Sequence, residues 1–124
     1  MKREIKFRGQ PTGMGGIWMV GIGAYKTYTA EHLVLNAKCD CVEVVHLCQY
    51  TGLKDCNGKE IYEGDLLEVA NHKRDKECIA DVIFLDGAFW LHFPNEDLLN
   101  IKEVSECWVV IGNIHDCPEL IKTE

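Results

Sequence analysis

The chain has 124 residues, of which 47% are hydrophobic, so its length suits one compact domain or a small barrel with an appended part. This composition excludes a disordered chain, and no apolar stretch approaches the roughly 20 residues of a membrane-spanning helix. Residues 1–49 carry six Lys/Arg and four Asp/Glu, whereas residues 50–124 carry seven and sixteen, for an overall net charge of −7. The acidic second part disfavours nucleic-acid binding there, because phosphate recognition depends on Lys and Arg.

The first elements expected along the chain are two short strands. Ile5 and Phe7 alternate with charged residues, which predicts a half-buried strand over residues 3–8. Residues 9–23 are rich in glycine and predict a loop, interrupted by a strand over 17–20. Residues 24–38 have too weak a pattern for an assignment. Since no apolar core follows the charged N-terminal residues, a secretory signal is not expected, and the predicted location is the cytoplasm.

The middle of the chain combines a strand with dense turn chemistry. Residues 41–48 are rich in β-branched side chains and predict a strand. Asn57-Gly58 is a strong hairpin signal, because a type I′ turn needs positive φ at both central residues. Residues 63–65 then predict a turn into a strand over 66–70.

The last part of the chain predicts a hairpin and a final strand. Polar residues 71–77 predict a loop, and Asp86-Gly87 predicts a tight turn between strands at 78–85 and 88–93. Residues 94–99 are expected to form one helical turn, residues 107–111 a strand, and Pro118 a short helix start. Several short strands with frequent turn signals indicate an all-β barrel or sandwich.

The seven cysteines predict reduced, mostly buried thiols rather than a disulfide framework. Their number is odd, their spacing is scattered and no secretory signal precedes them. They stand at positions 39, 41, 48, 56, 78, 107 and 117.

The candidate metal ligands are Cys39, Cys41, His46 and Cys48. Structural zinc usually takes cysteines two to four residues apart, and Cys39 and Cys41 are closer than that, although alternate strand residues share a face. The alternative is an ordinary β-core without metal, and no cofactor is expected.

The candidate binding residues are Trp90 and His92, on the face of the 88–93 strand opposite Phe89 and Leu91. An exposed Trp90 would suit a partner, because tryptophan is common at interaction hot spots. The alternative is that both faces are covered. No catalytic residues are identified. The lone serine, Ser105, stands between acidic residues, and the many Cys and His pairs offer no ranking.

Three blocks of sequence together resemble the YopX family. The first is residues 3–8, Arg-Glu-Ile-Lys-Phe-Arg. The second starts with Gln-Tyr-Thr-Gly-Leu-Lys-Asp at 49–55 and continues from Asn57 to Asp65. The third is Val-Ile-Gly-Asn-Ile at 110–114, followed by Pro-Glu-Leu at 118–120.

The resemblance implies an N-terminal β sub-domain at 1–49 and an SH3-like small β-barrel at 50–124, with at most short helical turns. It also implies a phage or prophage protein without an established activity. We therefore expect a non-enzymatic accessory protein that binds a host or phage protein in the cytoplasm of a bacterial host cell. The alternative is a nucleic-acid-binding or DNA-mimic regulator. A homo-oligomer is left open, and no membrane association is expected.

Overall fold

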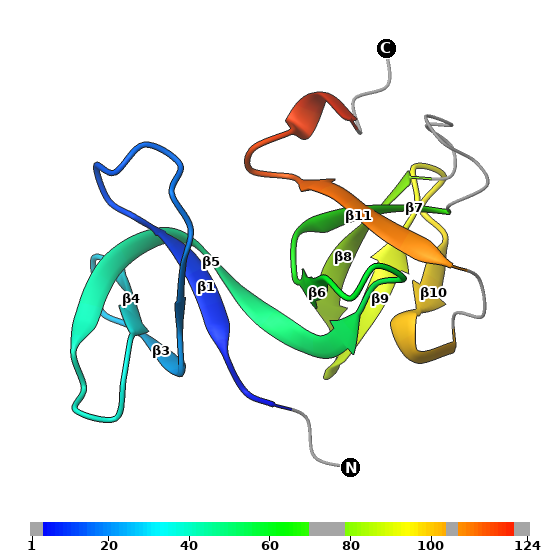
Figure 1. Ribbon diagram of the computed structural model, residues 1–124. Helices are drawn as coiled ribbons and strands as arrows, with labels where there is room; N and C mark the ends of the chain where they lie inside the picture. The colour runs from blue at the N-terminus through cyan, green and yellow to red at the C-terminus, as the bar shows by residue number, and fades with distance from the viewer. Residues whose placement is uncertain (1–3, 70–78, 104–106, 121–124) are drawn as a thin grey trace. The chain divides into compact units, whose positions relative to one another are not determined.

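The computed structural model describes residues 4–69, 79–103 and 107–120 and is mainly β, as predicted. The chain divides into two compact units, Met1–Gly52 and Leu53–Glu124, and each has its own antiparallel sheet. The sequence had placed this boundary after residue 49, inside strand β5 (Cys41–Lys54), which begins in the first unit and ends in the second (Figure 1). Within the described residues, no helix is long and apolar enough to cross a membrane.

The first unit is a sheet with the strand order β2-β1-β5-β4-β3. Its other strands are β1 (Phe7–Pro11), β2 (Met19–Gly21), β3 (Gly23–Lys26) and β4 (Glu31–Val34). The two outermost strands, β2 and β3, are separated in sequence by Ile22 alone. The sheet must therefore curl until its two edges approach each other.

The seam of this curled sheet lies at Gly21 and Val34. The Ile22 N–H donates to the Val34 carbonyl oxygen at 2.8 Å. A Cβ atom at Gly21 would overlap that same carbonyl oxygen and also press on Leu33, which is fully buried. Glycine is thus required here by the close approach of two backbones.

A bulge bends β5 in the middle of this sheet. Arg8 pairs with Cys48 and Gln10 pairs with Val45, so β5 has one residue more than β1 between these two pairs. His46 lies in the bulge with a φ of 57°, in the left-handed region. Bulges of this kind increase strand twist, which suits a sheet that curls this strongly.

The second unit contains a five-stranded sheet with the order β10-β9-β8-β7-β11. Its elements are β6 (Glu60–Tyr62), β7 (Asp65–Val69), β8 (Ile79–Leu85), β9 (Ala88–His92), β10 (Leu98–Asn100), η2 (Ile101–Glu103), β11 (Trp108–Asn113) and η3 (Pro118–Leu120). The small strand β6 pairs with β5. The predicted SH3-like barrel is not confirmed. The strand pairings among the described residues do not close the sheet, because β10 and β11 are its two edge strands and do not pair with each other.

One apolar cluster forms the core of the second unit. Alternate residues of the hairpin β8–β9 point into it, which explains the period-2 pattern of the sequence. Its buried members are Ile61, Leu67, Ala80, Val82, Phe89, Leu91, Ile101 and Trp108.

Two predicted hairpin turns differ in their outcome. The tight turn predicted at Asp86-Gly87 is confirmed, and the φ values of these residues, 52° and 80°, are those of a type I′ turn. At Asn57-Gly58 the type I′ prediction was wrong, because only Gly58 has a positive φ, of 83°. Asp55 and Lys59 instead close a three-residue loop, in which the Asp55 N–H donates to Lys59 at 2.8 Å.

Several element predictions need correction. The first strand is Phe7–Pro11 rather than 3–8, because its pairing with β5 continues through Gly9 to Pro11. The turn predicted at 94–99 ends earlier, since Leu98 and Leu99 pair with β9. Strands β3 and β4 lie where no assignment had been made. Cys78, Ser105 and the loop predicted at 71–77 lie outside the described residues.

We expect Gly21→Ala to destabilise the protein by about 1–3 kcal/mol, because the added methyl group overlaps the Val34 carbonyl. Urea unfolding of the full chain measures the loss. Gly23→Ala is the matched control, since its added Cβ would meet Val34 at an ordinary 3.8 Å. Equal stability of the two variants would contradict the close approach of Gly21 to the Val34 carbonyl.

Candidate functional site

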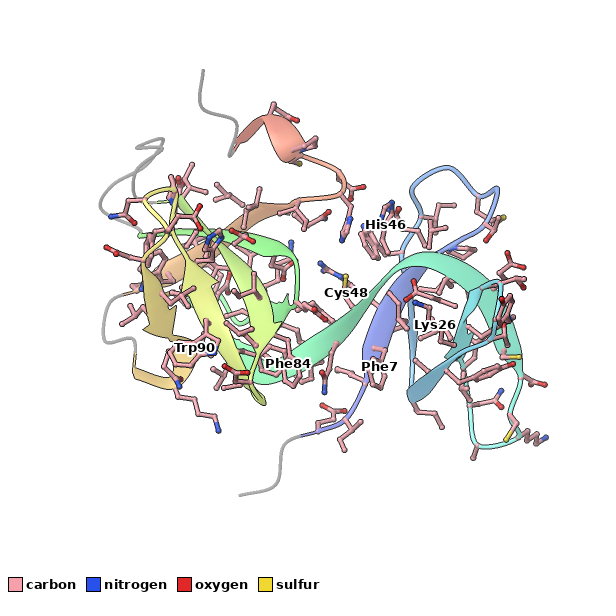
Figure 2. All side chains as sticks on the ribbon, turned by 180° about the vertical axis from the view of Figure 1, so that it is seen from behind. Phe7, Lys26, His46, Cys48, Phe84 and Trp90 are labelled. Carbon is pink, nitrogen blue, oxygen red and sulfur yellow. A yellow bond between two sulfur atoms is a disulfide. The ribbon has the colours of Figure 1, made fainter. Side chains whose placement is uncertain are left out.

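The four predicted metal ligands are not brought together by the fold. Cys41, His46 and Cys48 all lie on β5, and Figure 2 labels the last two. Cys41 and Cys48 are seven positions apart on this strand, which at about 3.3 Å per residue separates them by roughly 20 Å. Cys39 is close to Cys41 in sequence, but both are exposed, whereas Cys48 is buried.

Cys41 and Cys48 have local contacts within the first unit instead. The Cys41 sulfur lies 3.4 Å from the Tyr25 hydroxyl on the neighbouring hairpin. The Cys48 thiol lies 3.1 Å from the carbonyl oxygen of His46. Among the described residues, no group of three or more His, Cys, Asp or Glu side chains is arranged to hold a metal.

Trp90 lies on the outer face of the second unit's sheet, opposite the core (Figure 2). Its side chain is half-buried, and the indole N–H donates to the Leu85 carbonyl oxygen at 3.0 Å. Strand register places Ile83 directly beside it. Leu85 and Leu98 share this face and are 44% and 43% exposed. We call Ile83, Leu85, Trp90 and Leu98 the outer patch.

His92 adjoins the outer patch and is held by two carboxylates. Its Nδ1 lies 2.9 Å from Asp81 and its Nε2 lies 3.0 Å from Glu96. Asp81 is directly opposite on β8, and Glu96 stands in the following turn with a φ of 71°. The hydrogen bonds to Glu96 and Asp81 raise the pKa of His92 above 6.5, against the opposing effect of partial burial.

A cavity of about 350 Å³ opens within the second unit. Its walls are mostly apolar core residues, and charged residues stand where it meets solvent. The lining residues are Leu53, Lys54, Asp55, Cys56, Ile61, Leu67, Leu91, Ile101, Lys102 and Trp108. Its volume is near the lower end of the range typical of small-molecule pockets, roughly 300–1,000 Å³.

Asp55 fixes one side of this cavity through its carboxylate. One oxygen accepts hydrogen bonds from the backbone N–H groups of Asn57 and Lys59, each at 2.9 Å. The other accepts the Val110 N–H of β11, also at 2.9 Å. Burial raises the pKa of Asp55, but these backbone hydrogen bonds outweigh it and hold the pKa below 3.8. The carboxylate therefore joins the 55–59 loop to β11.

Trp108 supplies a buried donor on another wall. Its side chain is only 7% exposed and packs edge-on against Phe93, with ring centroids 5.9 Å apart. Its indole N–H has no hydrogen-bond acceptor among the described residues. A buried donor without a partner costs about 1–3 kcal/mol.

Cys56 and Cys107 stand at the same end of the cavity and form a disulfide, which contradicts the prediction that all thiols are reduced. Their Cα atoms are 5.6 Å apart, within the distance that a disulfide spans. The backbone explains this proximity, because the Cys56 N–H donates to the Trp108 carbonyl at 3.1 Å. The free cysteines among the described residues are Cys39, Cys41, Cys48 and Cys117, of which Cys48 is buried.

The sequence interpretation missed this cavity. Its walls come from β5, the 55–59 loop, β6, β7, β9, η2 and β11, so its lining residues are scattered along the chain. Each of the apolar residues looks like ordinary core. The available signal was Asp55, a turn-forming acid placed just after a strand, but that signal predicts a loop and not a cavity.

The comparisons with known proteins identify a family and one related structure. Residues 19–122 match the family described as YopX protein. The crystal structure of protein EF1440 from Enterococcus faecalis is 30% identical, and the match covers 95% of this chain and 75% of that one, with a TM-score of 0.49. No curated protein matches the chain.

We expect the stability contribution of His92 to depend on pH. Since its folded pKa lies above the ordinary 6.5, the contribution is fully present below 6.5 and is lost as the pH rises through the folded value. His92→Gln should cost about 1 kcal/mol at about pH 5 and little at about pH 9. Urea unfolding at both pH values tests this, and an equal cost at both would contradict it. Glu96→Gln should weaken the same dependence.

Asp55 should show the opposite dependence. Its folded pKa is lowered, so its contribution is present above 3.8 and is lost as the pH falls through the folded value. Asp55→Asn should cost about 1–3 kcal/mol near neutral pH, with a smaller cost at about pH 3. Asp86→Asn is the matched control, because it keeps an Asn-Gly turn, and should change stability by less than about 0.5 kcal/mol. A cost for Asp55→Asn that does not change with pH would contradict the assignment.

Proposed function

This chain belongs to the YopX family, and from that premise we propose a non-enzymatic accessory protein of a phage or prophage that acts by binding another protein. The observation that carries the proposal is the outer patch. It offers a half-buried tryptophan beside Ile83, with two leucines that are more than 40% exposed on the same sheet face. Contiguous apolar surface beside polar residues is typical of protein interaction sites.

The hydrogen bonds of His92 and Asp55 support a non-enzymatic role. Both ring nitrogens of His92 already face carboxylates. Both carboxylate oxygens of Asp55 accept backbone N–H groups. Their pKa shifts therefore follow from hydrogen bonds of the fold, which favours a structural role over acid–base chemistry.

The chemistry of the outer patch also indicates the kind of partner. Trp90 can act as an apolar anchor, because large aromatic side chains supply much of the binding energy at interfaces. Glu96, which contacts His92 next to the outer patch, has a side chain that is 82% exposed, and the chain as a whole is acidic. A partner with an apolar anchor and a basic rim would match both features.

A DNA-mimic regulator is the second candidate. Residues 50–124 carry sixteen acidic and seven basic side chains, a difference of nine negative charges. Such a protein would bind a DNA-binding partner rather than DNA, and salt would release that complex. Both candidates place a protein against the second unit.

The cytoplasm of the host cell is the proposed site of action. Thiols in that compartment are kept reduced, so the Cys56–Cys107 disulfide of this structure would open there into two thiols that the backbone holds close. Self-association through the outer patch would make the chain its own partner.

Native affinity capture from host cells tests the outer patch. Leu98→Lys should reduce recovery of the partner about tenfold or more, because it places a charge in an apolar contact with a basic rim. Val20→Lys is the matched control, since Val20 is 54% exposed in the first unit and gains the same charge. Circular dichroism checks that both variants fold.

The outcomes separate the alternatives. If the wild-type chain enriches no protein, protein binding is overturned. If Val20→Lys loses the partner and Leu98→Lys keeps it, the assignment to the outer patch is overturned. Recovery of a DNA-binding protein that salt releases would favour the mimic.

A further inference from the structure

We propose that the cavity of the second unit binds a small organic acid, with its apolar body against the core and its carboxylate at the lysines of the rim. This goes beyond the proposed function, because the cavity and the outer patch share no residues. Two features carry it: the apolar walls and the position of the basic side chains.

The walls fix the apolar part of the ligand. Leu91 and Leu67 are at most 1% exposed, and Ile61 and Ile101 are 4% and 7% exposed, so the lining is part of the core itself. A cavity of about 350 Å³ against these side chains suits a short alkyl chain or a single ring. Removing such a group from water is the main source of affinity in a site of this kind.

The charges fix the other end of the ligand. Two lysines, Lys54 and Lys102, line the cavity. Lys54 and Lys102 are exposed residues on different elements, at the end of β5 and in η2. Two positive charges at one rim make it locally favourable for an anion.

Asp55 does not cancel this preference. Both of its oxygens already accept hydrogen bonds, and three backbone N–H groups disperse its negative charge. Lys54 and Lys102 form no ion pair with a carboxylate of the described residues.

Trp108 offers a way to detect a ligand in the cavity. Its indole N–H is buried and has no acceptor in the part of the chain that the structure describes. Trp108 lines the cavity, so its indole signal should respond to a ligand bound there. This gives the site a spectroscopic reporter of its own.

Titration of the full chain with octanoate tests the proposal, with nitrogen-15 NMR of the three tryptophan indole N–H signals as the readout. Octanoate should shift the Trp108 signal in a saturable way, and Trp108→Phe identifies that signal. Acetate has the charge without the chain, and octan-1-ol has the chain without the charge. Both should bind about tenfold more weakly than octanoate or not at all.

Variants locate the charge and the cavity. Lys102→Gln should weaken octanoate binding about tenfold. Lys59→Gln is the matched control, because it removes the same charge from the same unit without lining the cavity, and it should leave the affinity unchanged. Leu53→Phe should abolish binding by filling the space, and Leu53 is only half-buried, so the fold should tolerate the change.

Two results would overturn the proposal. The first is an unchanged Trp108 signal throughout the octanoate titration, which would mean that the cavity holds only water. The second is equal binding of octanoate and octan-1-ol with no effect of Lys102→Gln, which would mean that the site does not select an acid. Neither result bears on the outer patch, so failure here is distinguishable from failure of the proposed protein binding.

Discussion

The second unit depends on one carboxylate, that of Asp55, more than on any other polar group. It accepts hydrogen bonds from N–H groups of its own loop and from the Val110 N–H of β11. Val110 is 55 residues from Asp55 in the sequence. A carboxylate suits this junction because it can accept several hydrogen bonds at once, whereas an amide offers one oxygen. By fixing the loop against β11, Asp55 holds Cys56 beside Trp108 and defines one wall of the cavity.

The two units bury their apolar side chains in different ways. In the first, a single residue joins the two outermost strands, so the sheet curls around a small core that includes Leu33 and Val44. In the second, a larger cluster packs against one face of the sheet and leaves the outer patch on the other. The outer face carries exposed apolar side chains, and His92 beside them is held by two carboxylates. This combination suits the binding of a partner.

The sequence predicted the strands of the second unit well because local alternation determines them. The hairpin at Asp86-Gly87 follows from turn chemistry and period-2 patterning, which neighbouring residues encode. Strands β3 and β4 were missed because their stability comes from pairing with distant β5, and their own residues are weakly patterned. The cavity could not be predicted, since its walls meet only after long-range pairing. The binding candidates Trp90 and His92 were identified from alternation alone. The spacing of the metal candidates along β5 keeps them apart.

The seam at Ile22 has a consequence for aggregation. Unpaired strand edges are the usual template for adding a foreign strand, and small β proteins need a way to protect them. In the first unit, the step from β2 to β3 turns the two outermost strands toward each other, and the Ile22 N–H is already bonded to Val34. The sheet thereby shields its own edges with its own chain, so strand addition there would first have to open the seam.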